Sequence, residues 1–412
     1  MRSMCPYSFK ASQLSRLIQA TVVVAATLGV SLLVPATVFG QDLSGEISLR
    51  YLRFSETSGA TQDEAGATVT PRLYWENNRG FRILAQPVVS WTADAEDPIY
   101  INPNQTYLRF STGNLDATLG SNVVFWGVSE GAQLSDILNQ RDLVSDFRGK
   151  DKIGRPMLRL GWGEAIARLD LFYLPLFQER RLRNAPLRLG NIGPNDTDNT
   201  LWPNDKQDHD PAVAARVTAT LENFELGAYG YRGLNIDPSY LSGLNGSRSV
   251  YETTIRLGGD IQWNHADLIL KYEGRYDSDA PTTLGTFEKE VSHLVGTEYI
   301  LYNVFQSEAS LTAITEYATS SIPDRALNPF QNDMLLGLRA ELDNLSSTEI
   351  TFAYSHDFTY GSDSFEIELQ TRLTDNAALD LFYTDTSNID GRDPYRGLRT
   401  DSHFSFSLVA AF

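Results

Sequence analysis

The feature that most constrains this chain is an alternation of apolar and polar residues that persists over stretches of about ten residues. Between residues 365 and 373 every second side chain is Phe, Ile, Leu or Thr, and the side chains between them are Glu, Glu, Gln and Arg. The same alternation runs through 251–263, 333–342 and 403–412. Successive side chains of a β-strand point to opposite faces, so each stretch predicts a strand with one apolar face and one charged face.

Strand length separates two folds that share this alternation. Soluble β-sandwiches turn the apolar face inward and use strands of about five or six residues. The longer stretches here match the ~9–11 tilted residues that cross a bilayer. Aromatic residues stand at the ends of many of them, among them Trp75, Trp162, Trp263 and Tyr383. We therefore expect an all-β fold, a transmembrane antiparallel up-and-down β-barrel with lipid outside and water inside.

The spacing of turn residues predicts about eighteen strands, or about sixteen if one hairpin is merged. Short connections such as 113–114 alternate with long ones such as 126–154 and 177–210. Membrane barrels have short periplasmic turns and longer external loops, so this alternation supports the strand map. Pro71 and Pro87 fall inside predicted strands, where proline interrupts the hydrogen-bond ladder, and we expect bulges there.

The start of the chain follows a different pattern. Arg2, Lys10 and Arg16 precede an apolar run that leads into small residues. This predicts a secretory signal peptide over residues 1–40 and a barrel over 41–412. A retained membrane anchor is the alternative, but the run is shorter than the ~20 residues that a spanning helix needs.

Charge and cysteine content exclude some classes of protein. The net charge is −18, from 34 basic and 52 acidic residues. Such a chain is not expected to bind nucleic acid. The acidic total favours a weak preference for cations in the interior, or a solvated surface if most acids lie in external loops. The only cysteine, Cys5, lies in the predicted leader, so no disulfide or cysteine metal site is expected.

Residues 125–156 interrupt the strand pattern. Leu134, Ile137 and Leu138 have the i, i+3, i+4 spacing of one helix face, and Ser129 can cap the amino end. We expect a short helix in this third external loop. Its apolar side needs a surface to lie against, which favours a position inside the barrel, with packing on other external loops as the alternative.

A family resemblance adds to this prediction. The C-terminal HFSFSLVAAF, ending on Phe412, resembles the terminal strand of Gram-negative outer-membrane barrels, whose last aromatic residue is read by the barrel-assembly machinery. The overall plan resembles outer-membrane porins, and VFWGVSEGAQLSDILNQRDL followed by KIGRPMLRL is similar to a segment of poorly characterised porin-like barrels. The resemblance implies an outer-membrane location, with membrane lipid, lipopolysaccharide and the assembly machinery as partners. It also implies that the third external loop folds back and narrows the pore.

Two sets of polar residues are expected to face the channel. Those of the third loop are Asp136, Asn139, Gln140, Arg141 and Asp142. Those of the strands are the arginines Arg82, Arg109, Arg159, Arg168 and Arg216 and the glutamates Glu341, Glu349, Glu366 and Glu368. The arginines and the glutamates fall on different walls of the predicted barrel, so we expect a field across the lumen. The alternative is pairing within each wall, because both signs mix between Glu252 and Arg275.

Other chemistry has little support in the sequence. The aspartates between Asp196 and Asp210 could hold Ca²⁺ or bridge lipopolysaccharide, but they lack the spacing of a calcium loop, so a solvated acidic loop is the simpler interpretation. Histidines such as His293 are dispersed, and no G-x-S-x-G, H-E-x-x-H or glycine-rich phosphate loop occurs. We expect no enzyme, no metal site and no cofactor.

Together these expectations favour a diffusion channel for small hydrophilic solutes, with residues 126–154 as the constriction and the inner charges as the filter. Two alternatives remain open. One is a non-conducting surface barrel whose external loops bind a polysaccharide or another partner. The other is an export channel for a polymer, which would need a continuous charged track.

Overall fold

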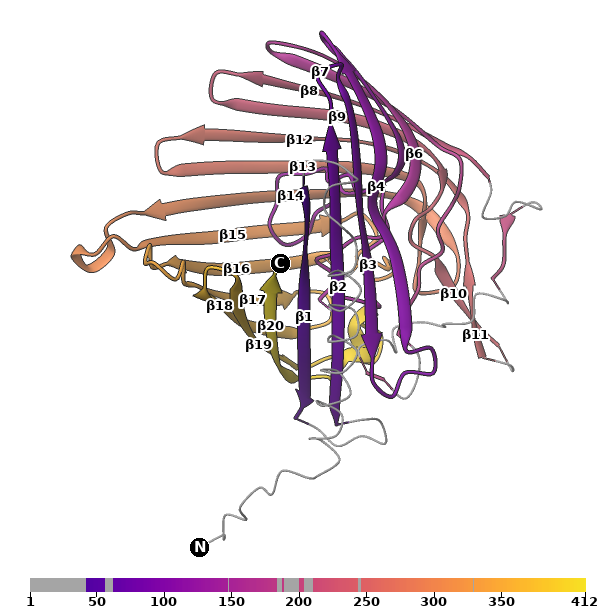
Figure 1. Cartoon of the computed structure of the whole chain (residues 1–412). Coiled ribbons are helices and arrows are strands. Elements are labelled where there is room, and N and C mark those ends of the chain that lie inside the picture. The colour runs from indigo at the N-terminus through magenta and orange to yellow at the C-terminus, as the bar shows by residue number, and fades with distance from the viewer. Residues whose placement is uncertain are drawn as a thin grey trace, which may run out of the picture.

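Eighteen strands close into one antiparallel β-barrel, in which β1 pairs with β20 (Figure 1). The computed structural model describes residues 42–55, 62–146, 148–183, 187–188, 200–203, 210–243, 246–328 and 330–412. The predicted signal peptide lies outside these residues. Apart from this closure, strands adjacent in the barrel follow one another in sequence, with β9 pairing β12 because a small hairpin, β10–β11, lies in the connection between them. The predicted fold and strand number are confirmed.

The strands of the barrel have the following bounds: β1 Asp42–Phe54, β2 Asp63–Glu76, β3 Phe81–Thr92, β4 Ile99–Thr112, β5 Leu115–Asn122, β6 Arg155–Glu164, β7 Ala167–Leu174, β8 Ala212–Leu221, β9 Phe224–Leu234, β12 Thr253–His265, β13 Leu268–Pro281, β14 Phe287–Leu301, β15 Ser310–Ser320, β16 Asn332–Glu341, β17 Glu349–Asp357, β18 Asp363–Thr374, β19 Ala377–Ser387 and β20 His403–Ala411. The outer hairpin is β10 Ser239–Gly243 with β11 Gly246–Val250, and two 3-10 turns are η3 Val304–Gln306 and η4 Pro394–Leu398. In the described part of the chain, no helix is long and apolar enough to cross a membrane.

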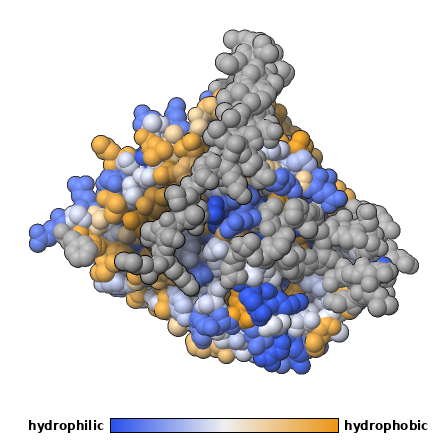
Figure 2. All heavy atoms as spheres, turned by 90° about the horizontal axis from the view of Figure 1, so that it is seen from below, coloured by the Kyte–Doolittle hydropathy of each residue, from blue (hydrophilic) through white to orange (hydrophobic). Residues whose placement is uncertain are grey.

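The two faces of the wall differ as the alternation predicts. On β12 and β13 the outward-facing Leu257, Ile261 and Leu270 are exposed, whereas the inward-facing Asp260 and Glu273 are buried inside the barrel. An apolar exterior around a charged interior is the arrangement of a membrane barrel. Figure 2 shows hydrophobic residues (orange) along one flank of the barrel, beside patches of hydrophilic residues (blue).

Two ends of the barrel can be named from the pairing. Gly45 and Phe412 exchange two backbone hydrogen bonds of 3.0 and 2.9 Å, which fixes the terminal end. The opposite end, where β5 leads into residues 126–154, is the loop end. The β2–β3 ladder breaks where Pro71 lies opposite Pro87, and the β3–β4 register shifts beside Pro87. Proline has no N–H to donate, which explains the break. The register shift confirms the bulge expected at Pro87, whereas the register is the same on both sides of Pro71, so the bulge expected there is wrong.

The short helix predicted in the third connection is wrong, because the described residues of 126–154 form turns, bends and one bridge but no helix. Leu134, Ile137 and Leu138 are buried as their spacing suggested. However, backbone N–H groups that would begin a helix donate to carboxylates of the barrel wall. The expected cap, Ser129, donates both its backbone N–H and its hydroxyl to Glu273. Charged acceptors on the wall therefore replace helical hydrogen bonds.

A new charge should lower the free energy of unfolding much more on the outer face than on the inner face. Val295 faces outward from the middle of β14 and is exposed, so Val295→Arg should lower the free energy of unfolding by about 2–4 kcal/mol in a bilayer. Gln370 is exposed inside the lumen, so Gln370→Arg should change it little. Denaturant titration of both variants in lipid vesicles measures the difference. An equal cost for the two would contradict the assignment of faces.

Candidate functional site

Residues 126–154, here called the inner segment, pack against the inner face of β7–β9. Trp126 lies 5.6 Å from Phe172 and 5.3 Å from Tyr229, measured between ring centroids. Ile137 and Leu138 join these rings in one buried apolar cluster. The apolar side of the segment therefore lies inside the barrel, as its spacing required, although the backbone is not helical.

Two wall carboxylates hold the first part of the inner segment. Glu273 of β13 accepts hydrogen bonds from the backbone N–H groups of Val128 (2.7 Å), Ser129 (2.9 Å) and Ser135 (2.8 Å). Glu316 of β15 accepts from the backbone N–H groups of Glu130 (2.6 Å) and Gly131 (2.9 Å). Glu273 is 0% and Glu316 2% exposed. Hydrogen bonds to a buried charge are among the stronger ones in proteins, so these strands fix the position of the segment.

Glu130 ties the same part of the inner segment to β16. Its carboxylate accepts from Arg339 at 3.0 Å and lies 3.4 Å from the Lys271 ammonium of β13. Burial acts to raise the pKa of Glu130, but the charges of Lys271 and Arg339 outweigh it and hold that pKa below its usual value. The ion pair is therefore formed at neutral pH, and its contribution to stability is lost as the pH falls through this lowered pKa.

The second part of the inner segment crosses to β18 and β19. A bridge between Arg141 and Lys152 closes a hairpin-like arm. Near its tip, Arg148 pairs with Glu368 at 2.5 Å and with Asp380 at 2.9 Å. Lys150 pairs with Glu368 at 2.7 Å. The segment is thus held on β13–β16 by its first half and on β18–β19 by its second half.

The five polar residues predicted in the inner segment bond mainly to the segment itself and to the backbone and side chains packed against it. Asn139 donates to the carbonyls of Asn122 and Ile153, both at 2.9 Å. Gln140 donates to the carbonyl of Ile236, and Arg141 to that of Gly149. Asp142 is 0% exposed and accepts from Asn102 at 2.7 Å, and Asp136 pairs with Lys152. Asn139, Gln140 and Asp142 are buried, and the Asp136 side chain is 3% exposed, so these four shape the segment rather than line open space.

The predicted inner arginines lie on the wall formed by β3–β8, and each has a carboxylate beside it. The shortest ion pairs are Arg82–Glu76 at 3.2 Å, Arg109–Asp116 at 3.4 Å, Arg159–Asp170 at 2.9 Å, Arg168–Asp116 at 2.6 Å and Arg216–Asp260 at 2.8 Å. Signs therefore mix locally on this wall, as in the alternative prediction of pairing within each wall.

The predicted inner glutamates lie on β16–β18 and are less fully paired. Glu368 pairs with Arg148 and Lys150 of the inner segment, and Glu349 lies 3.8 Å from Arg339. Glu341 accepts only from the Ser310 hydroxyl, at 3.4 Å. Glu366 has no hydrogen bond or ion pair to any described residue. Much of the positive charge at this wall comes from the inner segment rather than from the opposite wall.

The wall residues that hold the segment were not among those predicted from the sequence to line the channel. Glu273 and Glu316 stand at inward positions of alternating strands, which is a signal that they face the lumen. Nothing in the sequence distinguishes them from other inward carboxylates. Arg148 and Lys150 are conspicuous as cations near the tip of the segment, but their partners Glu368 and Asp380 lie far away in the chain. Only the closed barrel brings these groups together.

A second connection bridges the loop end. Arg183, in the connection from β7 to β8, pairs with Glu64 of β2 at 2.5 Å, and both are buried. The backbone N–H of Arg188 also donates to Glu64, and its guanidinium donates to the carbonyl of Thr400. This connection therefore reaches the seam between β1, β2 and β20. Of the candidate cation ligands in this connection, Asp196, Asp198, Asp205 and Asp208 lie outside the described residues, and Asp210 is half-buried.

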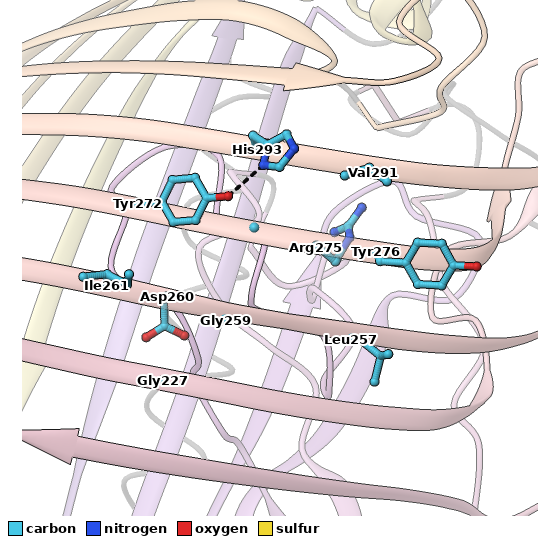
Figure 3. A pocket seen from close by; sticks show the side chains of 11 residues that line it. Gly227, Leu257, Gly259, Asp260, Ile261, Tyr272, Arg275, Tyr276, Val291 and His293 are labelled. Carbon is cyan, nitrogen blue, oxygen red and sulfur yellow. Dashed lines mark hydrogen bonds between the residues drawn. The ribbon is translucent and has the colours of Figure 1, made fainter.

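A pocket of about 350 Å³ indents the outer face across β9, β12, β13 and β14 (Figure 3). Its rim carries Tyr272 and His293, which point toward one another with 2.8 Å between the hydroxyl oxygen and Nδ1. Gly274 leaves room for the Tyr272 hydroxyl, because a Cβ there would lie 2.8 Å from it. Both rim residues face outward, so the pocket belongs to the lipid-facing surface and not to the lumen.

These features define a membrane β-barrel with a charged interior and a segment folded into it. Solved structures with a similar fold include two triple mutants of the Rhodopseudomonas blastica porin. One is 12% identical with a TM-score of 0.45 and the other 11% identical with a TM-score of 0.43, each alignment covering 90% of this chain and 99% of the porin. No family model matches the sequence, and no curated protein matches it. Similarity this low says nothing about what passes through this barrel.

Removing one wall carboxylate should free the inner segment without opening the barrel. Glu273→Ala leaves three backbone N–H groups, two of them buried, and the Ser129 hydroxyl without their acceptor, so the local opening free energy should fall by about 3 kcal/mol. Limited proteolysis and amide exchange in 126–146 measure this. Glu225→Ala, an exposed residue at the terminal end of β9, is the control. Unchanged protection would contradict the proposed anchor.

The buried pair inside the segment gives a second test. Burial raises the pKa of Asp136 and lowers the pKa of Lys152, and each charge opposes the shift in the other. Lys152→Met strands the Asp136 carboxylate and should cost about 3–5 kcal/mol of local stability. Lys152→Met with Asp136→Leu should recover much of that loss in the same exchange measurement. Equal losses in both variants would show that the charge pair is not the cause.

Proposed function

We propose that the protein is a non-enzymatic, porin-like diffusion channel of the outer membrane that admits small hydrophilic solutes. The observation that carries the proposal is the course of the inner segment through the barrel. It is held on β13–β16 by Glu273, Glu316 and Arg339, and on β18–β19 by Glu368 and Asp380. A barrel of this strand number leaves an aqueous lumen, and a segment fastened across it narrows the passage.

The wall charges support a role as the filter of this channel. The arginines of β3–β8 have carboxylate partners on the wall, whereas among the four glutamates of β16–β18 described above Glu368 alone pairs with cations of the inner segment. Charge at the constriction therefore depends on where the segment lies as well as on the strands. We propose that Arg141, Arg148 and Lys150 act with these glutamates on the solute, and that Asp136, Asn139, Gln140 and Asp142 maintain the shape of the segment.

The outer surface supports the proposed location. Large apolar side chains such as Leu257, Val295 and Phe406 are exposed around the barrel, which suits lipid contact and, at the external rim, lipopolysaccharide. The last strand ends with an exposed aromatic residue, Phe412, paired to Gly45. This end is available to the barrel-assembly machinery before β1 and β20 close, which is the partner that we propose for it.

Single-channel recording in planar bilayers tests the function directly. The complete mature barrel should give reproducible openings, and deletion of residues 130–150 should raise the conductance severalfold because the lumen loses its obstruction. Glu273→Ala should raise conductance or its noise in the same direction without removing any chain. Absence of openings from all three proteins would favour a non-conducting barrel. An unchanged conductance after the deletion would refute the constriction alone.

A further inference from the structure

The two attachments of the inner segment lie on either side of one strand. Arg339 of β16, Thr351 of β17 and Glu368 of β18 are direct partners in the ladder, so they form one row across the inner wall. The segment binds Arg339 through Glu130 and binds Glu368 through Arg148 and Lys150. Among the described residues, no hydrogen bond or ion pair joins the segment to β17. An interval therefore remains between the two attachments.

Exposure shows that this interval is open. Where the segment covers the wall, the inward-facing Glu273, Leu294 and Glu316 are 0%, 0% and 2% exposed. On β17 the inward-facing Thr351 is only half-buried, and Glu366 on β18 is exposed. An inward-facing residue is exposed only where the lumen beside it is empty. Strands lie ~4.8 Å apart, so the attachments at Arg339 and Glu368 are separated by roughly 10 Å, which suits a small hydrated solute.

Carboxylates lie above and below this interval. Toward the loop end, the next inward-facing row contains Gly337, Ala353 and Glu366, so a glycine and an alanine stand beside an unpaired carboxylate. Toward the terminal end, Glu341 and Glu349 face each other across β16 and β17. The cation nearest to Glu349 is Arg339, at 3.8 Å, and Arg339 also binds Glu130 at 3.0 Å. Negative charge is therefore in excess on both sides.

We infer that solutes pass along β17, between the Arg339 and Glu368 attachments, and that Glu366, Glu349 and Glu341 make this passage selective for small cations. The inference rests on the proposed channel function and adds the route and the charge class of the solute. A cation approaching from the loop end meets Glu366 first, passes Thr351, and leaves beside the two facing glutamates. An anion meets an excess of carboxylates on both sides of Thr351.

Reversal potentials in a KCl gradient test the charge class. The unmodified channel should favour K⁺ over Cl⁻, and Glu349→Gln combined with Glu366→Gln should lower that permeability ratio at least twofold. Glu308→Gln, an exposed residue of a short turn, is the matched carboxylate control and should leave the ratio unchanged. A ratio unchanged by the double substitution, in channels that conduct, would overturn the cation filter.

Thiol modification tests the route. The chain has a single cysteine, Cys5, in the predicted leader, so Thr351→Cys introduces the only thiol of the mature barrel. A cationic methanethiosulfonate reagent should then lower conductance by at least half. Phe352→Cys, on the outward face of the same strand, should give no change. Conducting channels insensitive at Thr351→Cys would refute the route and leave the channel function intact, whereas absence of conductance in every protein would refute both.

Discussion

The pairing of β1 with β20 is the constraint on which the rest of this structure depends. Once those strands join, the wall has no free edge, and every strand has an inside and an outside. The alternating sequence then places apolar side chains such as Leu257 and Ile261 on the outer, lipid-facing surface and polar ones such as Asp260 inside the barrel. The same closure brings β13, β16 and β18 to positions from which they can hold one segment. Without it, Glu273 and Glu368 would be distant carboxylates on an open sheet.

A polar interior also changes what a connection can do. A backbone segment buried in an apolar core must satisfy its own hydrogen bonds, which favours a helix. Inside this barrel the wall supplies charged acceptors, so Val128, Ser129 and Ser135 donate to Glu273 and need no helical partner. Side-chain burial and backbone conformation are thereby separated. The segment packs its apolar residues as a helix would, in a conformation that the wall determines.

This separation explains how much the sequence could predict. The strands, their number and the direction of their side chains follow from local alternation, and the structure confirms them. The spacing of Leu134, Ile137 and Leu138 correctly indicated burial, but it could not show which donors their backbone would use, because Glu273 is far away in sequence. Likewise, the inward position of Arg168 was predictable, whereas its pairing with Asp116 depends on the register between strands.

The pattern of pairing has a consequence for the electrostatics of the lumen. Arginines alone would make the β3–β8 wall strongly positive, but Asp116 and Asp170 stand within 3.4 Å of the charges on three of them and offset much of their field. On the opposite side Glu366 has no such partner among the described residues. Strand positions alone suggest a positive β3–β8 wall facing a negative β16–β18 wall. With the partners included, the β3–β8 wall is nearly neutral and the β16–β18 wall stays negative. The residual field depends on which charges lack partners, so we propose that the unpaired carboxylates, rather than the more numerous arginines, dominate the field that an ion would meet in the lumen.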